Sequence, residues 1–225
     1  MKRILAAAIA AALLLSGCTS ASRPAESAPP TEMPSPSPTP VVTPTPEPEP
    51  ADGELVLVRD YIPGIFIDLK YATTDNFTGR VIYDSDEAYL RYGTVKKLLC
   101  AQNELSGRGL SLKIWDAYRP VSAQFKLWEI CPNPVYVSDP NNGYSKHSRA
   151  NTVDITLVTD TGKSIPMPSG FDDFTSLADR DYSDVSAEAA ENARLLENVM
   201  VENGFVPYSG EWWHYSDSVS YDVYG

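Results

Sequence analysis

The sequence predicts an α+β domain, in which helices flank a mostly antiparallel central sheet. Short runs of alternating apolar and polar residues indicate strands, and three longer runs have the apolar spacing of helices. The last two predicted strands are joined by a short turn, which is typical of an antiparallel hairpin. The order of elements is mixed, with neither an internal repeat nor a Gly-rich phosphate loop. Together these observations favour the α+β class.

The first half of the domain is predicted to contain three strands and one helix. Strands are expected at 54–59 and 65–71, the second on the basis of its alternating pattern. A loop dense in turn-forming residues follows at 72–79. A helix is predicted over 86–106, with a buried side formed by Leu90, Val95, Leu98, Leu99 and Leu105. Alternating apolar residues then predict a strand that begins at Leu110.

Two further helices are predicted in the second half. Pro120 suits the first turn of a helix over 121–130, because proline lacks the N–H that this turn leaves unpaired. The last helix is expected to begin at Ser186, a favourable N-cap, and to run to Asn203, where Gly204 ends it.

Polar loops are predicted on both sides of another strand. Residues 132–151 are rich in Pro and Asn, the strand covers 152–158, and a second loop covers 159–183. A hairpin formed by 205–207 and 211–216 completes the predicted sheet.

The first eighteen residues have the layout of a secretory signal. Lys2 and Arg3 form a positive start, and the apolar run that follows is too short for a comfortable membrane span. Because this run ends in Leu-Ser-Gly-Cys18, the segment 1–18 resembles a bacterial lipoprotein signal. The resemblance implies that Cys18 is lipidated and becomes the new N-terminus. An ordinary cleaved signal with an incidental cysteine is the alternative.

Residues 19–52 predict an extended, disordered tether, because eleven of the nineteen prolines lie there among Ser, Thr, Ala and Glu. At about 3.1 Å per residue, the tether would hold a domain up to roughly 100 Å from the membrane. One folded domain is expected over 53–225. Its 25 acidic and 15 basic residues argue against nucleic acid or an anionic lipid surface as a partner.

Apart from Cys18, the chain contains only Cys100 and Cys131. In an exported protein these two could form a disulfide, and the sequence leaves that question open. Neither has another cysteine or a histidine nearby at metal-ligand spacing. We therefore exclude both from a metal site.

The chain has two histidines, and each lies near acidic residues. His147 is followed by Asp154, and His214 is preceded by Glu211. Two imidazoles, a ligating carboxylate and a spare carboxylate suit a catalytic zinc centre with an open position, because a structural centre has four ligands and usually uses cysteine. Taken alone, a loop histidine such as His147 is more often a surface or hydrogen-bonding residue.

The spacing of Glu211 and His214 raises a geometric difficulty. On a regular strand, residues i and i+3 point to opposite faces. The two side chains can share a site only if Glu211 lies at a bend, which Ser209 and Gly210 could provide. The alternative is that the aromatic segment 212–215 simply packs on the core.

Arg119 lies between a predicted strand end and the helix over 121–130. If its guanidinium faces the metal cleft, it would supply a fixed positive charge for a tetrahedral oxyanion. Arg119 could also form an ion pair with Asp116, a structural role that is compatible with stabilising the oxyanion.

Five stretches of the domain form recognisable motifs. They are Tyr71-Ala-Thr-Thr-Asp-Asn-Phe-Thr-Gly79, Trp115-Asp-Ala-Tyr-Arg-Pro120, Ser145-Lys-His-Ser-Arg149 through Asp154-Ile-Thr-Leu157, Gly170-Phe-Asp-Asp173 and Glu211-Trp-Trp-His-Tyr215. With these motifs the domain resembles, over essentially all its length, the zinc D-alanyl-D-alanine dipeptidases. These are the VanX-like branch (peptidase family M15) of the D,D-peptidase and hedgehog-domain superfamily. The Glu-Trp-Trp-His form points to this branch, since the related carboxypeptidases tend to have proline after the glutamate.

The resemblance implies a hedgehog/D,D-peptidase-like fold and one zinc ion per chain. The implied zinc ligands are His147, Asp154 and His214. Glu211 would be the general base, and Arg119 would stabilise the transition state. Asp172 would bind the free amino group of the substrate, and the implied pocket positions are Tyr71, Ser145 and Trp212.

The chain departs from the family's usual Ser-x-His-x-x-Gly-x-Ala-x-Asp pattern at Ala150 and Thr152. Both changes add bulk beside the metal, which affects substrate preference or rate more than metal binding.

The expected function is hydrolysis of D-Ala-D-Ala-type dipeptides, linked to peptidoglycan turnover. One alternative is a D,D-carboxypeptidase that acts on peptidoglycan stem peptides. Another is a non-catalytic, zinc-stabilised module that binds wall fragments. The protein is expected to be exported and lipid-anchored to the cell membrane, facing outside the cytoplasm. Its expected partners are a small D-amino-acid dipeptide and the membrane, and no nucleic acid or obligate protein partner is implied.

Overall fold

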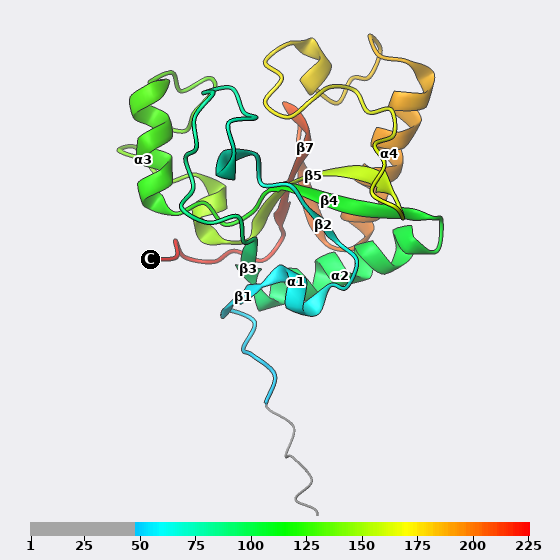
Figure 1. Ribbon diagram of the computed structural model, residues 1–225, viewed down its shortest axis with the longest axis horizontal. Coiled ribbons are helices and arrows are strands. Elements are labelled where there is room, and N and C mark those ends of the chain that lie inside the picture. The colour runs from blue at the N-terminus through cyan, green and yellow to red at the C-terminus, as the bar shows by residue number, and fades with distance from the viewer. Residues whose placement is uncertain (1–47) are drawn as a thin grey trace, which may run out of the picture. The chain divides into compact units, whose positions relative to one another are not determined.

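The computed structural model describes residues 48–225 and is shown as a ribbon in Figure 1. Its centre is a five-stranded sheet in the order β2-β4-β5-β7-β6. β2 (Phe66–Ile67) is parallel to β4 (Leu110–Asp116), and the other neighbouring strands are antiparallel. The other strands of this sheet are β5 (Thr152–Thr159), β6 (Phe205–Tyr208) and β7 (Glu211–Asp217). The predicted α+β class and mostly antiparallel sheet are therefore confirmed.

Helices α2 (Tyr92–Ser106) and α4 (Ala187–Glu202) pack against each other and against strands β4 and β6. Figure 1 places α3 (Val121–Ile130) on the opposite side of the molecule from α4. Buried apolar side chains from the strands and the two packed helices form one core: Leu98, Leu105, Leu112, Ile114, Val153, Ile155, Leu157, Leu196, Val199 and Met200. The helices thus flank the sheet, as expected.

The first two predicted strands are much shorter in the structure. β1 (Leu55–Leu57) ends at a single helical turn, α1 (Val58–Tyr61). Val58 and Ile62 are both fully buried, and residues four apart share one face of a helical turn rather than of a strand. Likewise, the chain leaves the sheet after β2 and forms the 3-10 turn η1 (Lys70–Ala72).

The helix predicted over 86–106 begins later than expected. Its first residues form a strand, β3 (Tyr89–Arg91), which pairs with β1 in a separate two-stranded sheet. Leu90 lies opposite Val56 in this pair and is fully buried. Leu90 fits the apolar spacing of a helix in the sequence. It lies in a strand because it pairs with Val56, a residue distant along the chain.

Several predicted boundaries are confirmed. α3 covers the predicted residues, and Ser186 caps α4 by accepting a hydrogen bond from the Ala189 N–H at 3.2 Å. Gly204 follows α4 with a left-handed φ of 85°, a conformation that glycine adopts without strain. Each predicted polar loop also holds one 3-10 turn, η2 (Lys146–Arg149) and η3 (Ser176–Ala178).

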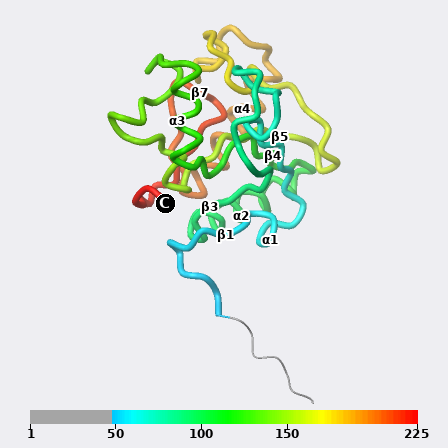
Figure 2. Tube along the Cα trace, turned by 60° about the vertical axis from the view of Figure 1, so that its left-hand side comes forward, coloured from blue at the N-terminus to red at the C-terminus, as the bar shows by residue number. Residues whose placement is uncertain are grey.

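The tail of the described chain, residues 218–225, lies against β3 and η2. The Arg91 side chain donates to the Asp222 carbonyl at 2.8 Å, and the Arg149 side chain donates to the Tyr221 carbonyl at 2.7 Å. The N–H of Tyr224 donates to the Ser148 carbonyl at 2.9 Å. Both views of the molecule show this tail near β3 (Figures 1 and 2).

Cys100 and Cys131 are free thiols in the structure, so they form no disulfide. Among residues 48–225, no helix has both the length and the apolar character that a membrane span requires. The predicted signal with Cys18, and the predicted tether up to residue 47, lie outside the described residues.

Candidate metal centre and active site

Three neighbouring strands each contribute one acidic or imidazole side chain to the same row of the sheet. Asp154 on β5 is in register with His214 on β7 and, on its other side, with Asp116 on β4. His147 comes from η2, the turn that precedes β5. Between them, Ala150 has a left-handed φ of 58°, and this turn lets His147 and Asp154 face each other despite their distance along the chain.

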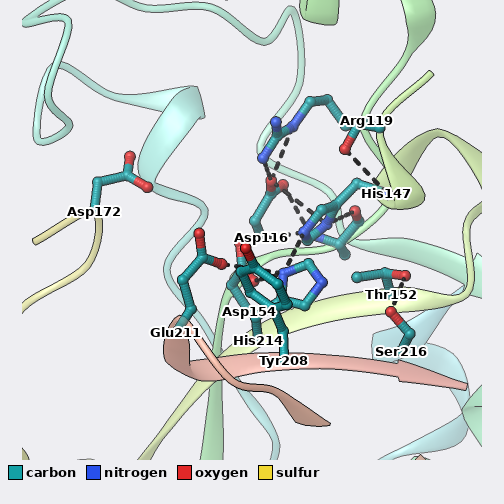
Figure 3. A network of polar contacts seen from close by, with 12 residues as sticks. Asp116, Arg119, His147, Thr152, Asp154, Asp172, Tyr208, Glu211, His214 and Ser216 are labelled. Carbon is teal, nitrogen blue, oxygen red and sulfur yellow. Dashed lines mark hydrogen bonds and ion pairs between the residues drawn. The ribbon is translucent and has the colours of Figure 1, made fainter. Parts of the chain in front are cut away.

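The donor atoms of His147, Asp154 and His214 converge on one point (Figure 3). His214 Nδ1 lies 2.9 Å from Asp154 Oδ1, and His147 Nε2 lies 3.3 Å from Asp154 Oδ2. The two ring nitrogens are 3.4 Å apart, and all three ligand atoms lie within 4.8 Å of one another. Two imidazoles and one carboxylate with this spacing fit a catalytic zinc ion that keeps a position open.

The surroundings of His147 orient it as a ligand. Its Nδ1 lies 2.9 Å from the Ala117 carbonyl, an acceptor that holds the proton on Nδ1 and leaves Nε2 free for a metal. Burial lowers the pKa of His147, but the charges of Asp154 and Asp116 outweigh burial and raise it above its ordinary value. The position between these groups therefore attracts positive charge, either a proton or a metal ion.

The other two ligands are in the protonation states that a metal requires. Burial lowers the pKa of His214, which favours its neutral form. Burial alone would raise the pKa of Asp154, but the charge and hydrogen bond of His147, with those of His214, hold that pKa below its ordinary value. A neutral imidazole and an ionised carboxylate are the forms that bind zinc.

Glu211 reaches the same point because β7 is bulged. Its partner on β6 is Tyr208, whereas the residue before Tyr208, Pro207, pairs with Tyr215. The extra residues on β7 turn Glu211 and His214 to the same side, as the predicted bend requires. The irregularity lies in β7 itself, beyond the turn where the bend was expected. As a result, Glu211 Oε2 lies 3.4 Å from His214 Nδ1.

The environment of Glu211 favours its protonated form in the absence of a cation. Burial and the negative charge of Asp154 raise the pKa of Glu211 to about 8. A divalent cation at the three ligands would lower this pKa again, because it would offset the charge of Asp154. Glu211 could then exchange a proton near neutral pH, as a general base must.

Arg119 is buried beside this cluster. Two of its nitrogens donate to Asp116 Oδ2, at 3.1 and 2.5 Å, so the ion pair considered from the sequence is present. The guanidinium also lies over the Tyr71 ring, 5.0 Å from its centroid. Its positive charge opposes the rise in the pKa values of Glu211 and Asp172, which places Arg119 within electrostatic reach of both carboxylates.

Asp172 lies across the site from Glu211 (Figure 3). It accepts a hydrogen bond from the Tyr71 hydroxyl at 2.8 Å. Its φ of 52° is left-handed, a strain of about 1–3 kcal/mol that non-glycine residues mostly show at functional sites. Burial raises the pKa of Asp172 to about 7, against the effect of the hydrogen bond from Tyr71. A half-buried carboxylate whose one hydrogen-bond donor among the described residues is Tyr71 suits an incoming ammonium group.

A cavity of about 260 Å³ opens beside Glu211 and His214. Ser145 lines it, as the sequence predicts for a pocket residue. The remaining lining residues come from β6, from η2 and from the loop before it: Pro134, Val135, Tyr136, Ser138, Lys146 and Tyr208. The cavity therefore gives a small molecule access to the carboxylate that lies next to the ligands.

The other two predicted pocket residues are buried. Tyr71 contacts the site residues Asp172 and Arg119, but its own side chain is buried beneath them and is not exposed to solvent. Trp212 is fully buried, donates its indole N–H to Ser169 at 2.9 Å and packs against Trp115. The structure thus places Trp212 in the core, because adjacent residues of a strand point to opposite faces and Glu211 faces the cavity.

Sequence reasoning missed residues that hold the site together. From the sequence, Asp116 is expected only to pair with Arg119, but its Oδ2 also lies 3.6 Å from His147 Nδ1. Tyr208 lines the cavity and lies edge-on to His214, with ring centroids 5.7 Å apart. Asp116 had a signal, its place in the Trp-Asp-Ala-Tyr-Arg motif, whereas nothing in the sequence marks Tyr208.

Comparisons with known proteins identify a family of similar chains. A family model described as D-ala-D-ala dipeptidase, Peptidase_M15, matches residues 51–221. The D-alanyl-D-alanine dipeptidase of Escherichia coli K12 is 39% identical over 162 residues, covering 72% of this chain and 83% of that protein. The Enterococcus faecium dipeptidase is 35% identical over 176 residues, which cover 69% and 87%. The Streptomyces coelicolor dipeptidase is 36% identical over 188 residues, which cover 73% and 91%.

Two solved structures resemble the chain in part. One is a mutant of the vancomycin-resistance D,D-pentapeptidase VanY in complex with Zn(II), with a TM-score of 0.39, 16% identity, and coverage of 59% of this chain and 75% of that one. The other is VanYB in complex with D-alanine-D-alanine, with a TM-score of 0.40, 16% identity, and coverage of 68% and 85%.

Proposed function

Because this chain belongs to the D-alanyl-D-alanine dipeptidase family of M15 peptidases, we propose that it hydrolyses D-Ala-D-Ala-type dipeptides with one zinc ion. The proposal rests on the convergence of three ligands, His147, Asp154 and His214, beside a carboxylate that is not needed as a ligand. A metal site that served only stability would be closed by a fourth ligand instead. The free carboxylate of Glu211 therefore supports catalysis over a purely binding role.

The side chains divide the reaction between them. When bound, zinc supplies a Lewis acid that polarises the scissile carbonyl and lowers the pKa of the attacking water. Glu211 accepts a proton from that water as its oxygen bonds to the carbonyl carbon. The C–N bond then breaks, and Glu211 returns the proton to the departing amine, which regenerates its carboxylate. The Arg119 guanidinium stabilises the negative charge that develops on the carbonyl oxygen.

Asp172 supports a substrate with a free amino terminus. In its ionised form it would pair with the substrate ammonium, while the Tyr71 hydroxyl keeps the carboxylate in place. This contact selects for a peptide whose free amino terminus lies only one residue before the scissile bond. A dipeptide meets that requirement.

Aromatic contacts near Asp172 also favour a short substrate. Phe174, two residues beyond Asp172, packs at a tilt against Tyr136 of the cavity wall, with ring centroids 4.4 Å apart, and meets Phe77 edge-on at 5.4 Å. We call Phe77, Tyr136 and Phe174 the aromatic closure. It links the segment that carries Asp172 to Tyr136 of the cavity wall, and this link would obstruct the path of a longer peptide.

A comparison of substrates tests the proposal. The zinc-loaded protein should hydrolyse D-Ala-D-Ala with a higher kcat/KM than a pentapeptide stem ending in the same two residues, and chelation should abolish both activities. A clear preference for the pentapeptide would assign the protein as a D,D-carboxypeptidase. If zinc is bound but neither peptide is cleaved, the site is a binding module for wall fragments.

We also propose that the protein is exported and anchored to the outer side of the cell membrane by a lipid on Cys18, where it would act in peptidoglycan turnover. The support is the positive start, the short apolar run and the Leu-Ser-Gly-Cys18 sequence. Cell fractionation tests this: the wild type and Cys100→Ala should sediment with membranes, and Cys18→Ala should not. Recovery of the wild-type protein mainly from the cytosol would contradict the proposal.

A further inference from the structure

We propose that Arg180 is a positioning residue for this active site: its guanidinium holds the bulged part of β7 in the conformation that brings Glu211 and His214 together. Arg180 lies in the loop between η3 and α4 and belongs to none of the motifs found in the sequence. The kinetic part of this inference rests on the proposed dipeptidase function, and its structural part does not.

The Arg180 side chain donates to two carbonyls at the bulge. Its Nε donates to the Tyr208 carbonyl at 2.7 Å, and its Nη2 donates to the His214 carbonyl at 3.1 Å. The register of β6 against β7 shifts between Pro207, which pairs with Tyr215, and Tyr208, which pairs with Glu211, so the regular ladder is interrupted beside both carbonyls. Carbonyls in such a stretch need other donors, and a planar guanidinium can bind two of them at a fixed separation.

Arg180 is itself held from the other side. Its Nη1 donates to Glu197 Oε2 on α4 at 2.9 Å and to the Tyr215 hydroxyl at 3.1 Å. The guanidinium lies over the Tyr215 ring, 4.6 Å from its centroid, and the side chain is only 10% exposed. A desolvated, multiply bonded arginine of this kind is a rigid link, and it joins α4 to the bulge of β7.

Within residues 48–225, the polar contacts of the Arg180 side chain are with Tyr208, Tyr182, Glu197, His214 and Tyr215, and none is with a ligand atom, Glu211 or Asp172. Any effect on the reaction therefore passes through the backbone of His214 and Tyr208. The ammonium site comes from other segments, since Asp172 is held by Tyr71 of η1. Loss of the two carbonyl contacts should therefore disturb the catalytic geometry and leave substrate binding largely intact. The expected signature is a fall in kcat without a matching change in KM.

Three variants separate this role from general stabilisation. Arg180→Lys keeps the charge beside Glu197 but cannot bind both carbonyls, and Arg180→Gln removes the charge as well. Glu197→Gln is the matched control, because it weakens the ion pair and leaves both carbonyl contacts in place. Each variant is measured for kcat and KM on D-Ala-D-Ala and for the visible absorption spectrum of its Co(II)-substituted form, which reports the geometry of the ligands.

We expect kcat of both Arg180 variants to fall by about 100-fold, the size of effect that a displacement of roughly 1 Å in an active site can produce. Their KM should stay within about threefold of the wild type, since binding by Asp172 is retained. Their Co(II) spectra should differ from that of the wild type, and Glu197→Gln should match the wild type in all three measurements.

Wild-type kcat in Arg180→Lys would overturn the proposal, and so would an equal loss of kcat in Glu197→Gln. If circular dichroism shows that neither Arg180 variant folds, Arg180 serves overall stability and the positioning role is rejected. If the unaltered protein cleaves no dipeptide, the proposed function fails, but the Co(II) spectra still decide whether Arg180 controls the ligand geometry.

Discussion

Glu211 and Asp172 are both carboxylates whose pKa is raised by burial, yet their surroundings suit them to different tasks. Glu211 lies 3.4 Å from a ligand nitrogen, and the charge of Asp154 adds to the rise in its pKa. Asp172 lies farther from the ligands and accepts a hydrogen bond from Tyr71. The first can exchange a proton with water at the metal, and the second can pair with a fixed cation.

Replacing Glu211 tests its role as a general base. Glu211→Ala should lower kcat on D-Ala-D-Ala by about 10³-fold, since general acid–base catalysis typically contributes 10²–10⁴-fold. Zinc content, measured by atomic absorption, should remain one ion per chain because all three ligands are retained. Glu188→Ala, at an exposed position of α4, is the control and should behave as the wild type. Loss of zinc in Glu211→Ala would instead identify Glu211 as a ligand.

Asp172 should make KM depend on pH. With its pKa raised to about 7, Asp172 is mostly neutral below pH 7 and mostly ionised above it. Only the ionised form pairs with the substrate ammonium, so KM for D-Ala-D-Ala should fall roughly fivefold to tenfold between pH 6 and pH 7.5. Steady-state kinetics across this range check the trend.

Two variants isolate the carboxylate that titrates. Asp172→Asn should raise KM and make it independent of pH over the same range. Asp173→Asn should keep the wild-type dependence, because Asp173 hydrogen-bonds to Thr175 at the surface. If the pH dependence survives in Asp172→Asn, another group controls substrate binding.

At the scale of single elements, the sequence predicts best what local chemistry determines. α3 follows Pro120 and α4 follows the Ser186 cap, and both occur where expected because these signals act within one helical turn. The predictions fail where a distant partner decides, as at Leu90, whose strand depends on pairing with Val56. The sequence predicts a bend near Glu211, because Glu211 and His214 could not otherwise share a site. The position of the bulge could not be predicted, because it depends on how β7 pairs with β6.

The aromatic closure can be tested as an element that limits substrate length. Truncating Phe174 or Tyr136 to Ala should remove a contact of about 0.5–1.5 kcal/mol and loosen the link across the cavity. The ratio of kcat/KM for a pentapeptide stem to kcat/KM for D-Ala-D-Ala should then rise, by roughly five- to tenfold. Parallel assays on both substrates measure this ratio.

The control for the closure comes from the same loop. Tyr144 is exposed to a similar extent as Tyr136 but has no aromatic partner among the described residues, so Tyr144→Ala should leave the ratio unchanged. An unchanged ratio in both Phe174→Ala and Tyr136→Ala would show that other residues exclude longer peptides.

At the scale of the whole molecule, the metal site joins segments far apart in the chain. The ligands and Glu211 could be predicted because their side chains carry the chemistry and occur in motifs. Arg180 could not, because it acts through the carbonyls of Tyr208 and His214, which every residue possesses. The position of Trp212 illustrates the same limit, since its neighbour Glu211 faces the cavity and the alternation of side chains along β7 buries Trp212.

Zinc should therefore stabilise the entire domain. An ion that binds the folded chain at about 1,000 times its Kd adds about 4 kcal/mol to the free energy of unfolding. For a domain of this size, each kcal/mol lost from the free energy of unfolding lowers Tm by about 2–4 °C. Chelation should therefore lower Tm by roughly 10 °C. Differential scanning calorimetry with and without chelator measures this shift. The variant His214→Ala should show little response to the chelator, and an equal response would place the stabilising ion elsewhere.

The contacts of the tail 218–225 tie that end of the domain to the turn carrying His147. Tyr224 binds the carbonyl of Ser148, the residue next to His147, and Arg149 binds the carbonyl of Tyr221. Loss of these contacts would release the turn without touching any ligand. A variant that lacks residues 218–225 should therefore lose zinc to a colorimetric chelator faster than the unaltered protein.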